Sequence, residues 1–339
     1  HMNSCSIYAD DEDIKKYRKN LFDIIAKIKK DKKLIFEDTP LPLPSSLFQL
    51  AYQNKADDRL LLERLADALL NNKTVQKCLV SKKTGKPSKM GPKKIRIAII
   101  SDYLGNHAVG HHFNSLINFL LDSDMEVKVF SRTPPREHTQ APEETTKIPY
   151  TQLPASISAS CTIVKNYNAD MVLFTEIGMS AHTLTLALAR MAPIQALIAG
   201  HPCTSGMKSI DYFVSSELVE CPGNQQFYTE QLVLLTTFPS TMKFPSLPEK
   251  ILSRTEMGLP ESQVLIGFPH SLFKLHPDFD QILETIAKRN KNVRFIFVNS
   301  PNQYLAELVQ KRWINNAPSI LSHSIFLDPM PLKRFLMLL

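Results

Sequence analysis

Short apolar runs that alternate with amphipathic segments constrain the fold of this 339-residue chain more than any other feature. Each run ends at a loop of polar or small residues. Runs that are mainly apolar predict strands buried in a parallel sheet, with helices in between. The strands predicted in this way are residues 95–100, 125–130, 171–174, 194–199, 212–214, 264–268, 293–298 and 324–327.

Apolar residues at helical spacing predict the intervening helices. They are residues 11–30, 57–70, a segment from 113 to 121, a segment through 184–188, 280–289, 304–313 and a final helix after residue 327.

Two stretches divide the chain. Residues 82–94 are rich in Gly, Pro and Lys, and residues 239–248 have proline at both ends. A chain of this length is too long for one ordinary core. We therefore predict an N-terminal helical segment (1–81), a basic linker (82–94), a first Rossmann-like domain (95–240) and a second that begins at 241 and continues to 339.

Composition excludes several classes of protein. A hydrophobic fraction of 43% and a charged fraction of 22% are typical of globular domains, and no apolar run is long enough to cross a bilayer. The five cysteines are scattered and odd in number, so we expect a reducing, cytoplasmic compartment, with delivery into another cell as the alternative. The first predicted strand is not followed by G-x-G-x-x-G, so a dinucleotide cofactor is not expected.

The net charge of +7 suits an anionic ligand. The lysines of residues 82–94 fit either a flexible tether or a nucleic-acid contact. Because no aromatic residues interleave with these lysines, a nucleic-acid partner is not expected.

The loop G-H-P-C-T-S-G, residues 200–206, is the first candidate site. Gly200 and Gly206 can adopt positive φ, and Thr204 and Ser205 offer hydroxyl and amide groups. Such a loop beyond the carboxyl end of a strand lets the backbone approach a ligand closely. An ordinary connection between two strands is the alternative.

The loop S-D-Y-L-G-N-H, residues 101–107, is the second candidate. His107 can act as a base or donate to a phosphate. It could instead bind a metal with His111 and His112, but Ala108 stands where the zinc-protease pattern requires glutamate. A structural histidine at the start of a helix is a further alternative. Lys274, in the loop 269–274, could stabilise a leaving diphosphate or be an ordinary surface lysine.

Six motifs in order resemble the catalytic region of the O-GlcNAc transferase-like, SPINDLY-type protein glycosyltransferases. They are S-D-Y-L-G-N-H (101–107), A-P-I-Q-A (192–196), G-H-P-C-T-S-G (200–206), I-D-Y-F-V-S-S-E (210–217), Y-T-E-Q-L (228–232) and S-L-F-K-L-H-P (271–277).

This resemblance implies an α/β fold of the GT-B type, with two Rossmann-like domains that face a cleft. It also implies inverting, metal-independent transfer of a GlcNAc-like sugar from a nucleotide diphosphate sugar to protein Ser or Thr, or to Asn in bacterial N-glucosylating relatives. The expected donor is UDP-GlcNAc and the expected partner is an acceptor protein, with no cofactor, metal or membrane.

The resemblance also assigns roles. His107 matches the histidine beside the sugar and acceptor, and Gly200, His201 and Pro202 match the loop that closes on the donor. Lys274 matches the lysine that binds the diphosphate. The predicted catalytic residues are therefore His107 and Lys274, and the predicted donor-binding residues are Gly200, His201, Pro202, Thr204, Ser271 and Lys274.

The chain departs from the family pattern in the second domain. Ser271 stands where O-GlcNAc transferases carry glutamine, and Leu332 and Phe335 stand near a lysine and a histidine of the family. Because the sequence ends at Leu339, we expect part of the nucleotide pocket to be missing. The chain is then either a fragment of a longer enzyme or a degenerate relative that binds a sugar nucleotide or a protein without catalysis.

Overall fold

The structure is a computed structural model that describes residues 7–42, 45–55, 58–79, 94–105, 107–133, 148–240, 248, 250–299 and 303–338. The chain forms two compact units. One consists of Leu21–Lys243 and the other of Asn3–Asn20 with Phe244–Leu339. Residues 7–20, which the sequence analysis grouped with those up to 81, belong to this second unit. Most of the expected linkers, residues 82–93 and 241–247, lie outside the described residues.

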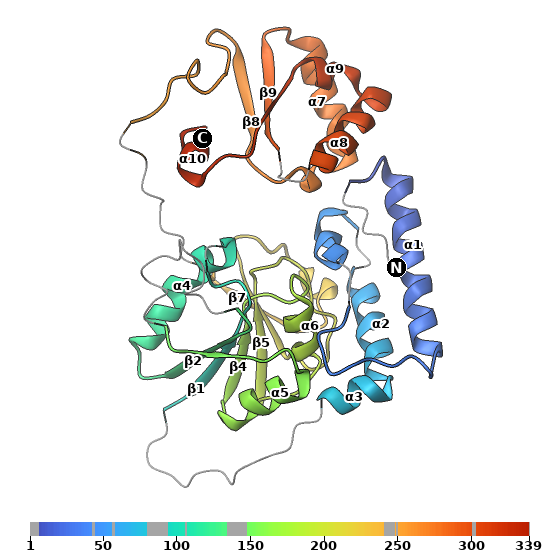
Figure 1. The fold of residues 1–339 in the computed structure, drawn as a ribbon, viewed down its shortest axis with the longest axis vertical. Coiled ribbons are helices and arrows are strands. Elements are labelled where there is room, and N and C mark those ends of the chain that lie inside the picture. Colours follow the sequence, from blue (N-terminus) through green and yellow to red (C-terminus); the bar gives the residue numbers. More distant parts are fainter. Residues whose placement is uncertain are drawn as a thin grey trace. The chain divides into compact units, whose positions relative to one another are not determined.

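A parallel sheet of seven strands forms the centre of the larger unit (Figure 1). Its order is β3-β2-β1-β4-β5-β6-β7, so the chain starts in the middle of the sheet and reverses direction between β1 and β4. Such a reversal is the point at which open α/β sheets bind ligands. The strands are β1 (Arg96–Ile100), β2 (Glu126–Ser131), β3 (Tyr150–Gln152), β4 (Met171–Phe174), β5 (Ile194–Ile198), β6 (Tyr212–Ser216) and β7 (Gln231–Leu235).

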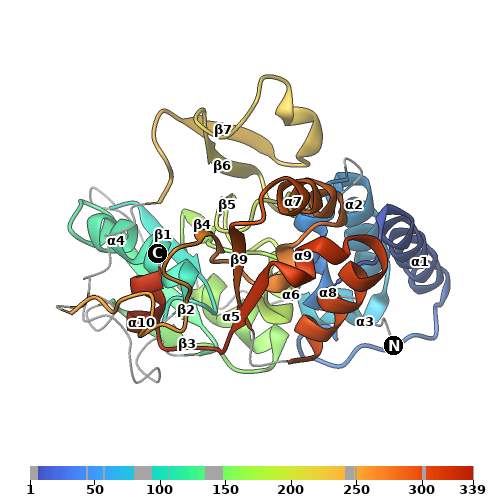
Figure 2. The same cartoon turned by 90° about the horizontal axis from the view of Figure 1, so that it is seen from above.

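Successive side chains along each strand point to opposite faces of this sheet, so a core forms on both faces. Ile97 and Ile99 pack with Phe113 and Ile117 of α4 (Ala108–Leu121) on one face. The intervening Ala98 and Ile100 are fully buried and point to the opposite face, since side chains alternate along a strand. Helices α5 (Ile157–Asn166) and α6 (Ala181–Ala187) cover that face (Figure 2).

The helical segment before the first strand comprises α1 (Asp11–Lys30), η1 (Ser45–Tyr52), α2 (Asp58–Leu70) and α3 (Lys73–Leu79). The predicted helices at residues 11–30 and 57–70 are confirmed by α1 and α2. Helix α3 packs against α5 of the larger unit. Asp38 reinforces this contact, because its carboxylate accepts the hydroxyls of Ser156 and Ser158 and the backbone N–H of Ser158.

The second unit is a parallel sheet of order β10-β9-β8. Its core holds Phe268, Phe295, Phe297 and Trp313, and N-terminal Ile7 packs into it. The unit contains β8 (Val264–Phe268), η5 (Leu272–Lys274), α7 (Pro277–Arg289), β9 (Val293–Val298), α8 (Gln303–Asn316), α9 (Pro318–Ser322), β10 (Ser324–Leu327) and α10 (Leu332–Leu338). The predicted strands 264–268, 293–298 and 324–327 match β8, β9 and β10 at both ends.

Within the described part of the chain, no helix has both the length and the apolar character needed to cross a membrane.

Candidate functional site

Three loops meet at one edge of the seven-stranded sheet. They follow β1, β4 and β5, which are adjacent and parallel, so their carboxyl ends lie side by side. The loops after β1 and β5 are the two predicted candidate loops, residues 101–107 and 200–206. The loop after β4, residues 175–180, lies between them and was not singled out from the sequence.

Glu176 of this central loop holds the β1 loop. Its side chain is fully buried. One carboxyl oxygen accepts the Asp102 backbone N–H at 2.9 Å, and the other accepts the Ser101 hydroxyl at 2.8 Å and the Thr175 hydroxyl. Burial raises the pKa of Glu176 to about 8, although the three hydrogen bonds oppose this shift. Nothing in the composition or spacing of the sequence singles out Glu176, because its role depends on partners in the β1 loop.

Asp102 links the same two loops a second time. Its carboxylate accepts the Ser180 hydroxyl at 2.6 Å and the Arg132 backbone N–H at 3.0 Å, and it lies 3.3 Å from Nδ1 of buried His182. Burial alone would raise the pKa of Asp102, but the contacts with His182 and Ser180 lower it below its usual value. Asp102 therefore remains ionised inside the cluster.

His107 is the N-cap of α4. Its Nδ1 accepts the backbone N–H of Val109 at 3.2 Å, and its ring packs 4.6 Å from the ring of Tyr103. The Tyr103 hydroxyl in turn donates to the carbonyl of Met179 in the β4 loop. An Nδ1 atom that accepts a hydrogen bond carries no proton, so the neutral ring has its proton on Nε2. In this state His107 donates through Nε2 and does not accept a proton there.

Gly200 makes the close approach between the β5 and β4 loops possible. A Cβ atom at this position would lie 2.2 Å from the carbonyl oxygen of Thr175 and 2.8 Å from the ring of Phe113. Of the two glycines expected to allow positive φ, Gly206 does so at +69°, whereas Gly200 does not. The glycine at 200 is therefore required by the lack of space and not by its backbone conformation.

The remaining residues of this loop are largely buried. His201 is 2% exposed, and its ring lies 4.7 Å from that of Phe48 in η1. Burial lowers the pKa of His201 to about 4, so the ring is neutral at physiological pH. Pro202 is exposed at the tip. The hydroxyls of Thr204 and Ser205, predicted to be available to a ligand, instead donate to buried Glu230.

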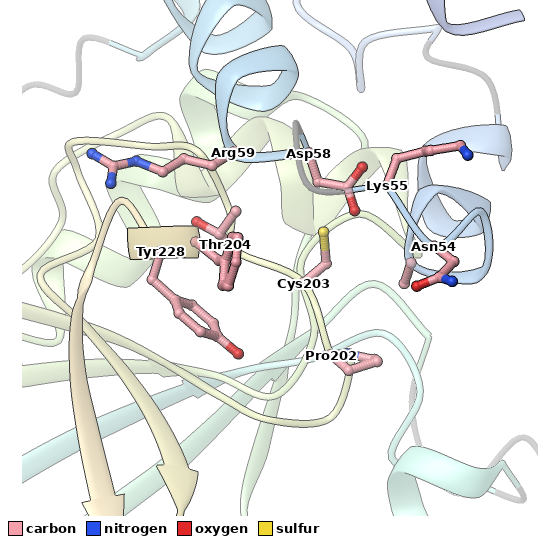
Figure 3. Close-up of a pocket in the computed structure, with 10 residues that line it drawn as sticks. Asn54, Lys55, Asp58, Arg59, Pro202, Cys203, Thr204 and Tyr228 are labelled. Carbon is pink, nitrogen blue, oxygen red and sulfur yellow. The ribbon is translucent and has the colours of Figure 1, made fainter. Parts of the chain in front are cut away.

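A pocket of about 380 Å³ opens beside the loop tip (Figure 3). Pro202, Cys203 and Thr204 form one wall, and residues of η1, the segment after it, α2 and the segment before β7 form the rest. The other lining residues are Ala51, Asn54, Lys55, Asp58, Arg59, Phe227 and Tyr228. Its volume is within the range of small-ligand sites.

The second unit carries the other predicted residues. Ser271 is the N-cap of the short helix η5, which follows the carboxyl end of β8, and Lys274 is the last residue of that helix; both are exposed. Leu332 and Phe335 lie on α10. The apposition of Lys274 to His107 and Pro202 across a cleft stays a prediction.

Two of the three histidines that the sequence suggested as possible metal ligands, His107 and His112, contact other groups. His107 caps α4 through Nδ1, and His112 Nδ1 lies 3.2 Å from the Ser240 hydroxyl. The described residues contain no group of three His, Cys, Asp or Glu side chains arranged to hold a metal ion.

Comparison with known proteins adds sequence relatives. No protein-family model matches the chain. It is 26% identical over 212 residues to a probable UDP-N-acetylglucosamine–peptide N-acetylglucosaminyltransferase SEC of Arabidopsis thaliana, an alignment that covers 60% of the chain and 22% of the relative. It is 28% identical over 163 residues to a UDP-glucose:protein N-beta-glucosyltransferase of Actinobacillus pleuropneumoniae, covering 46% of the chain and 25% of the relative. The chain thus spans about a quarter or less of the length of these relatives.

The fold has a match among solved structures. An O-GlcNAc transferase of Thermobaculum terrenum superposes with a TM-score of 0.59 at 18% identity, covering 86% of this chain and 58% of that one. The expected α/β fold is confirmed by this match together with the parallel sheets described above. The chain is therefore a sequence relative of the SEC- and SPINDLY-type O-GlcNAc transferases, with a fold of the GT-B type.

Proposed function

We propose that this chain belongs to a protein glycosyltransferase that moves a GlcNAc-like sugar from a nucleotide diphosphate sugar to Ser or Thr of an acceptor protein. The observation that carries the proposal is the meeting of the 101–107 and 200–206 loops at the strand-order reversal, held together by the β4 loop. These two loops carry two of the six family motifs. UDP-GlcNAc is the proposed donor, because the SEC relative is named for it.

The proposed roles follow from what inverting transfer requires. The acceptor hydroxyl must lie in line with the sugar, its proton must pass to a base or to the departing diphosphate, and that diphosphate must be stabilised. His107, with its proton on Nε2, is proposed to donate a hydrogen bond to donor or acceptor, and Gly200, His201 and Pro202 to shape the donor side. Lys274, with Ser271 nearby, is proposed to bind the diphosphate. No metal or cofactor is invoked, so positive charge at the leaving group comes from lysine and helix N-termini.

The proposal is tested by titrating UDP-GlcNAc, UDP-glucose and a GDP-sugar into the purified chain by calorimetry, and by measuring nucleotide release with a library of acceptor peptides. Peptides that contain Ser, Thr or Asn distinguish transfer to oxygen from transfer to nitrogen, which the name of the Actinobacillus relative makes worth including. We expect binding and peptide-dependent release with the UDP-sugar.

A non-catalytic relative is the second candidate, favoured by Ser271, Leu332 and Phe335, which depart from the family pattern. It predicts binding of a nucleotide sugar without peptide-dependent release. If none of the sugar nucleotides binds or turns over, the glycosyltransferase proposal is wrong. We further propose a cytoplasmic site of action, since Cys78, Cys161 and Cys221 are reduced thiols in the described part of the chain.

A further inference from the structure

Glu230, the residue just before β7, accepts hydrogen bonds from the 200–206 loop. Its side chain is 1% exposed. Oε1 accepts the backbone N–H of Ser205 at 2.8 Å and the Ser205 hydroxyl, while Oε2 accepts the Thr204 hydroxyl at 2.6 Å. Hydrogen bonds to a carboxylate are stronger than those between neutral groups, and they strengthen further when shielded from water. One buried side chain therefore fixes two consecutive loop residues.

The two hydroxyls extend this hold along the backbone. Thr204 Oγ1 accepts the N–H groups of Gly206 at 3.2 Å and Thr229 at 3.1 Å, and Ser205 Oγ accepts the N–H of Met207 at 3.1 Å. A hydroxyl has a single proton, so a hydroxyl that donates to Glu230 keeps its lone pairs directed at these amides. Glu230 thereby orients the backbone from residue 204 to residue 207, directly or through one hydroxyl.

Residues of η1 and α2, in the helical segment, also pack against the 200–206 loop. The ring of Phe48 in η1 lies 4.7 Å from the His201 ring, tilted by 30°, and a Cβ atom added at Gly206 would lie 2.4–2.5 Å from atoms of Leu62 in α2. Glu63 of α2 also accepts the hydroxyl of Thr229, the neighbour of Glu230, at 2.9 Å. The loop is thus held between α2 and Glu230, with Pro202 exposed at its tip.

Residues of the 200–206 loop line a cavity. Pro202, Cys203 and Thr204 form a wall of the 380 Å³ pocket, and Thr204 is itself bonded to Glu230. A shift of the Glu230 carboxylate would move this wall and the exposed tip together. Cys203 and Thr204 are 7% and 5% exposed, so the wall has little freedom to relax without its support.

We propose that Glu230 is a positioning residue for nucleotide-sugar binding: it never touches the donor, but it holds the loop of Gly200, His201 and Pro202 in the conformation that binds it. This inference rests on the proposed function of that loop. Displacements of about 1 Å in a substrate-positioning segment are enough to lower activity about a hundredfold, so the loss of one hydrogen bond beneath the loop is expected to be measurable.

Glu230→Gln is the first variant. The amide has the same shape, but it can present an oxygen to only one of the two hydroxyl groups, and its NH2 group then faces the other. Calorimetry with UDP-GlcNAc is expected to show a rise in Kd of about tenfold, and peptide-dependent nucleotide release a rise in donor KM with a smaller change in kcat. A purely structural residue would lower the melting temperature without this division between KM and kcat.

Asp38→Asn is the matched control. Asp38 accepts the same set of donors, two hydroxyls and one backbone N–H, but it joins the helical segment to α5 and not to the loop. Its Kd for UDP-GlcNAc is expected to equal that of the wild type. Ser205→Ala, a milder change, tests the network if Glu230→Gln folds poorly, and should raise the Kd about threefold. The double variant should show less than the product of the two effects, because both changes act on the same network of hydrogen bonds around Glu230.

The outcomes separate the two proposals. Wild-type protein that binds no sugar nucleotide overturns the proposed function and this inference with it. Wild-type protein that binds UDP-GlcNAc, together with Glu230→Gln and Ser205→Ala variants of unchanged Kd and KM, overturns the positioning role alone. An equal effect of Asp38→Asn would show that the loss reflects general destabilisation, and would also overturn it.

Discussion

The hydroxyl of Ser101 donates to Oε2 of Glu176 at 2.8 Å, across 75 residues of sequence. This contact joins the carboxyl ends of β1 and β4, where the strand order of the sheet reverses. With the Asp102 backbone N–H on the other oxygen, Glu176 fixes the start of the loop that ends at His107. The predicted site is therefore supported by a carboxyl group that faces no solvent.

Glu176 makes stability depend on pH. Burial raises its folded-state pKa from 4.5 to about 8, so the folded state binds more protons than the unfolded state between these values. The free energy of unfolding should then fall as the pH rises from 5 to 9, by up to about 4 kcal/mol from this group. In Glu176→Gln this contribution is absent. Urea unfolding at several pH values measures the difference between the two proteins, and parallel pH profiles would contradict the expectation.

His107 has two separable roles. Asparagine is a good N-cap, whereas alanine is a poor one, so His107→Ala should lose about 1 kcal/mol of stability and His107→Asn only a few tenths. Both variants lack the Nε2–H group, and both should reduce peptide-dependent transfer about tenfold or more. Thermal unfolding and nucleotide release measure the two effects. Full activity of His107→Asn would restrict this residue to capping α4.

Gly200→Ala should damage the site without any change in charge. The added methyl group would lie 2.2 Å from the carbonyl oxygen of Thr175, so the backbone of the β4 or β5 loop must move. We expect a loss of about 2 kcal/mol or more in the free energy of unfolding. Gly267→Ala in β8 is the control, because a methyl group added there would have no atom within 4 Å, and it should be nearly neutral. Similar unfolding curves for the two variants would argue against a tight contact at Gly200.

Lys274→Ala tests the role proposed for the second unit. Lys274 is exposed, so its removal should leave the melting temperature within about 2 °C of the wild type. Loss of a charge that stabilises the leaving diphosphate should lower kcat about tenfold or more. Lys311→Ala, an exposed lysine on α8 of the same unit, is the matched control and should be fully active. If Lys274→Ala turns over as fast as the wild type, Lys274 does not stabilise the leaving diphosphate, and that role belongs to another residue.

The sequence by itself located eight of the ten strands in the described part of the chain, and therefore where the candidate loops begin. β4, β8, β9 and β10 match the predicted runs at both ends, because each is a run of mainly apolar residues bounded by polar residues or turns. Elements without such a run were missed. β3 is three residues long and polar, and α5 places Ser160 beside Cys161 on its buried face, which breaks the apolar pattern. The predictions also omitted η1, α3, β7 and α9.

Only the tertiary structure decided what holds the site together. Neither Glu176 nor Glu230 stands out by composition or spacing, since each is defined by partners that the fold brings from 75 and 25 residues away. The same is true of Gly200, whose lack of a side chain matters because the carbonyl oxygen of Thr175 occupies that space. Apolar periodicity is a local property of the chain, whereas the partner of a buried polar group depends on which strands become neighbours.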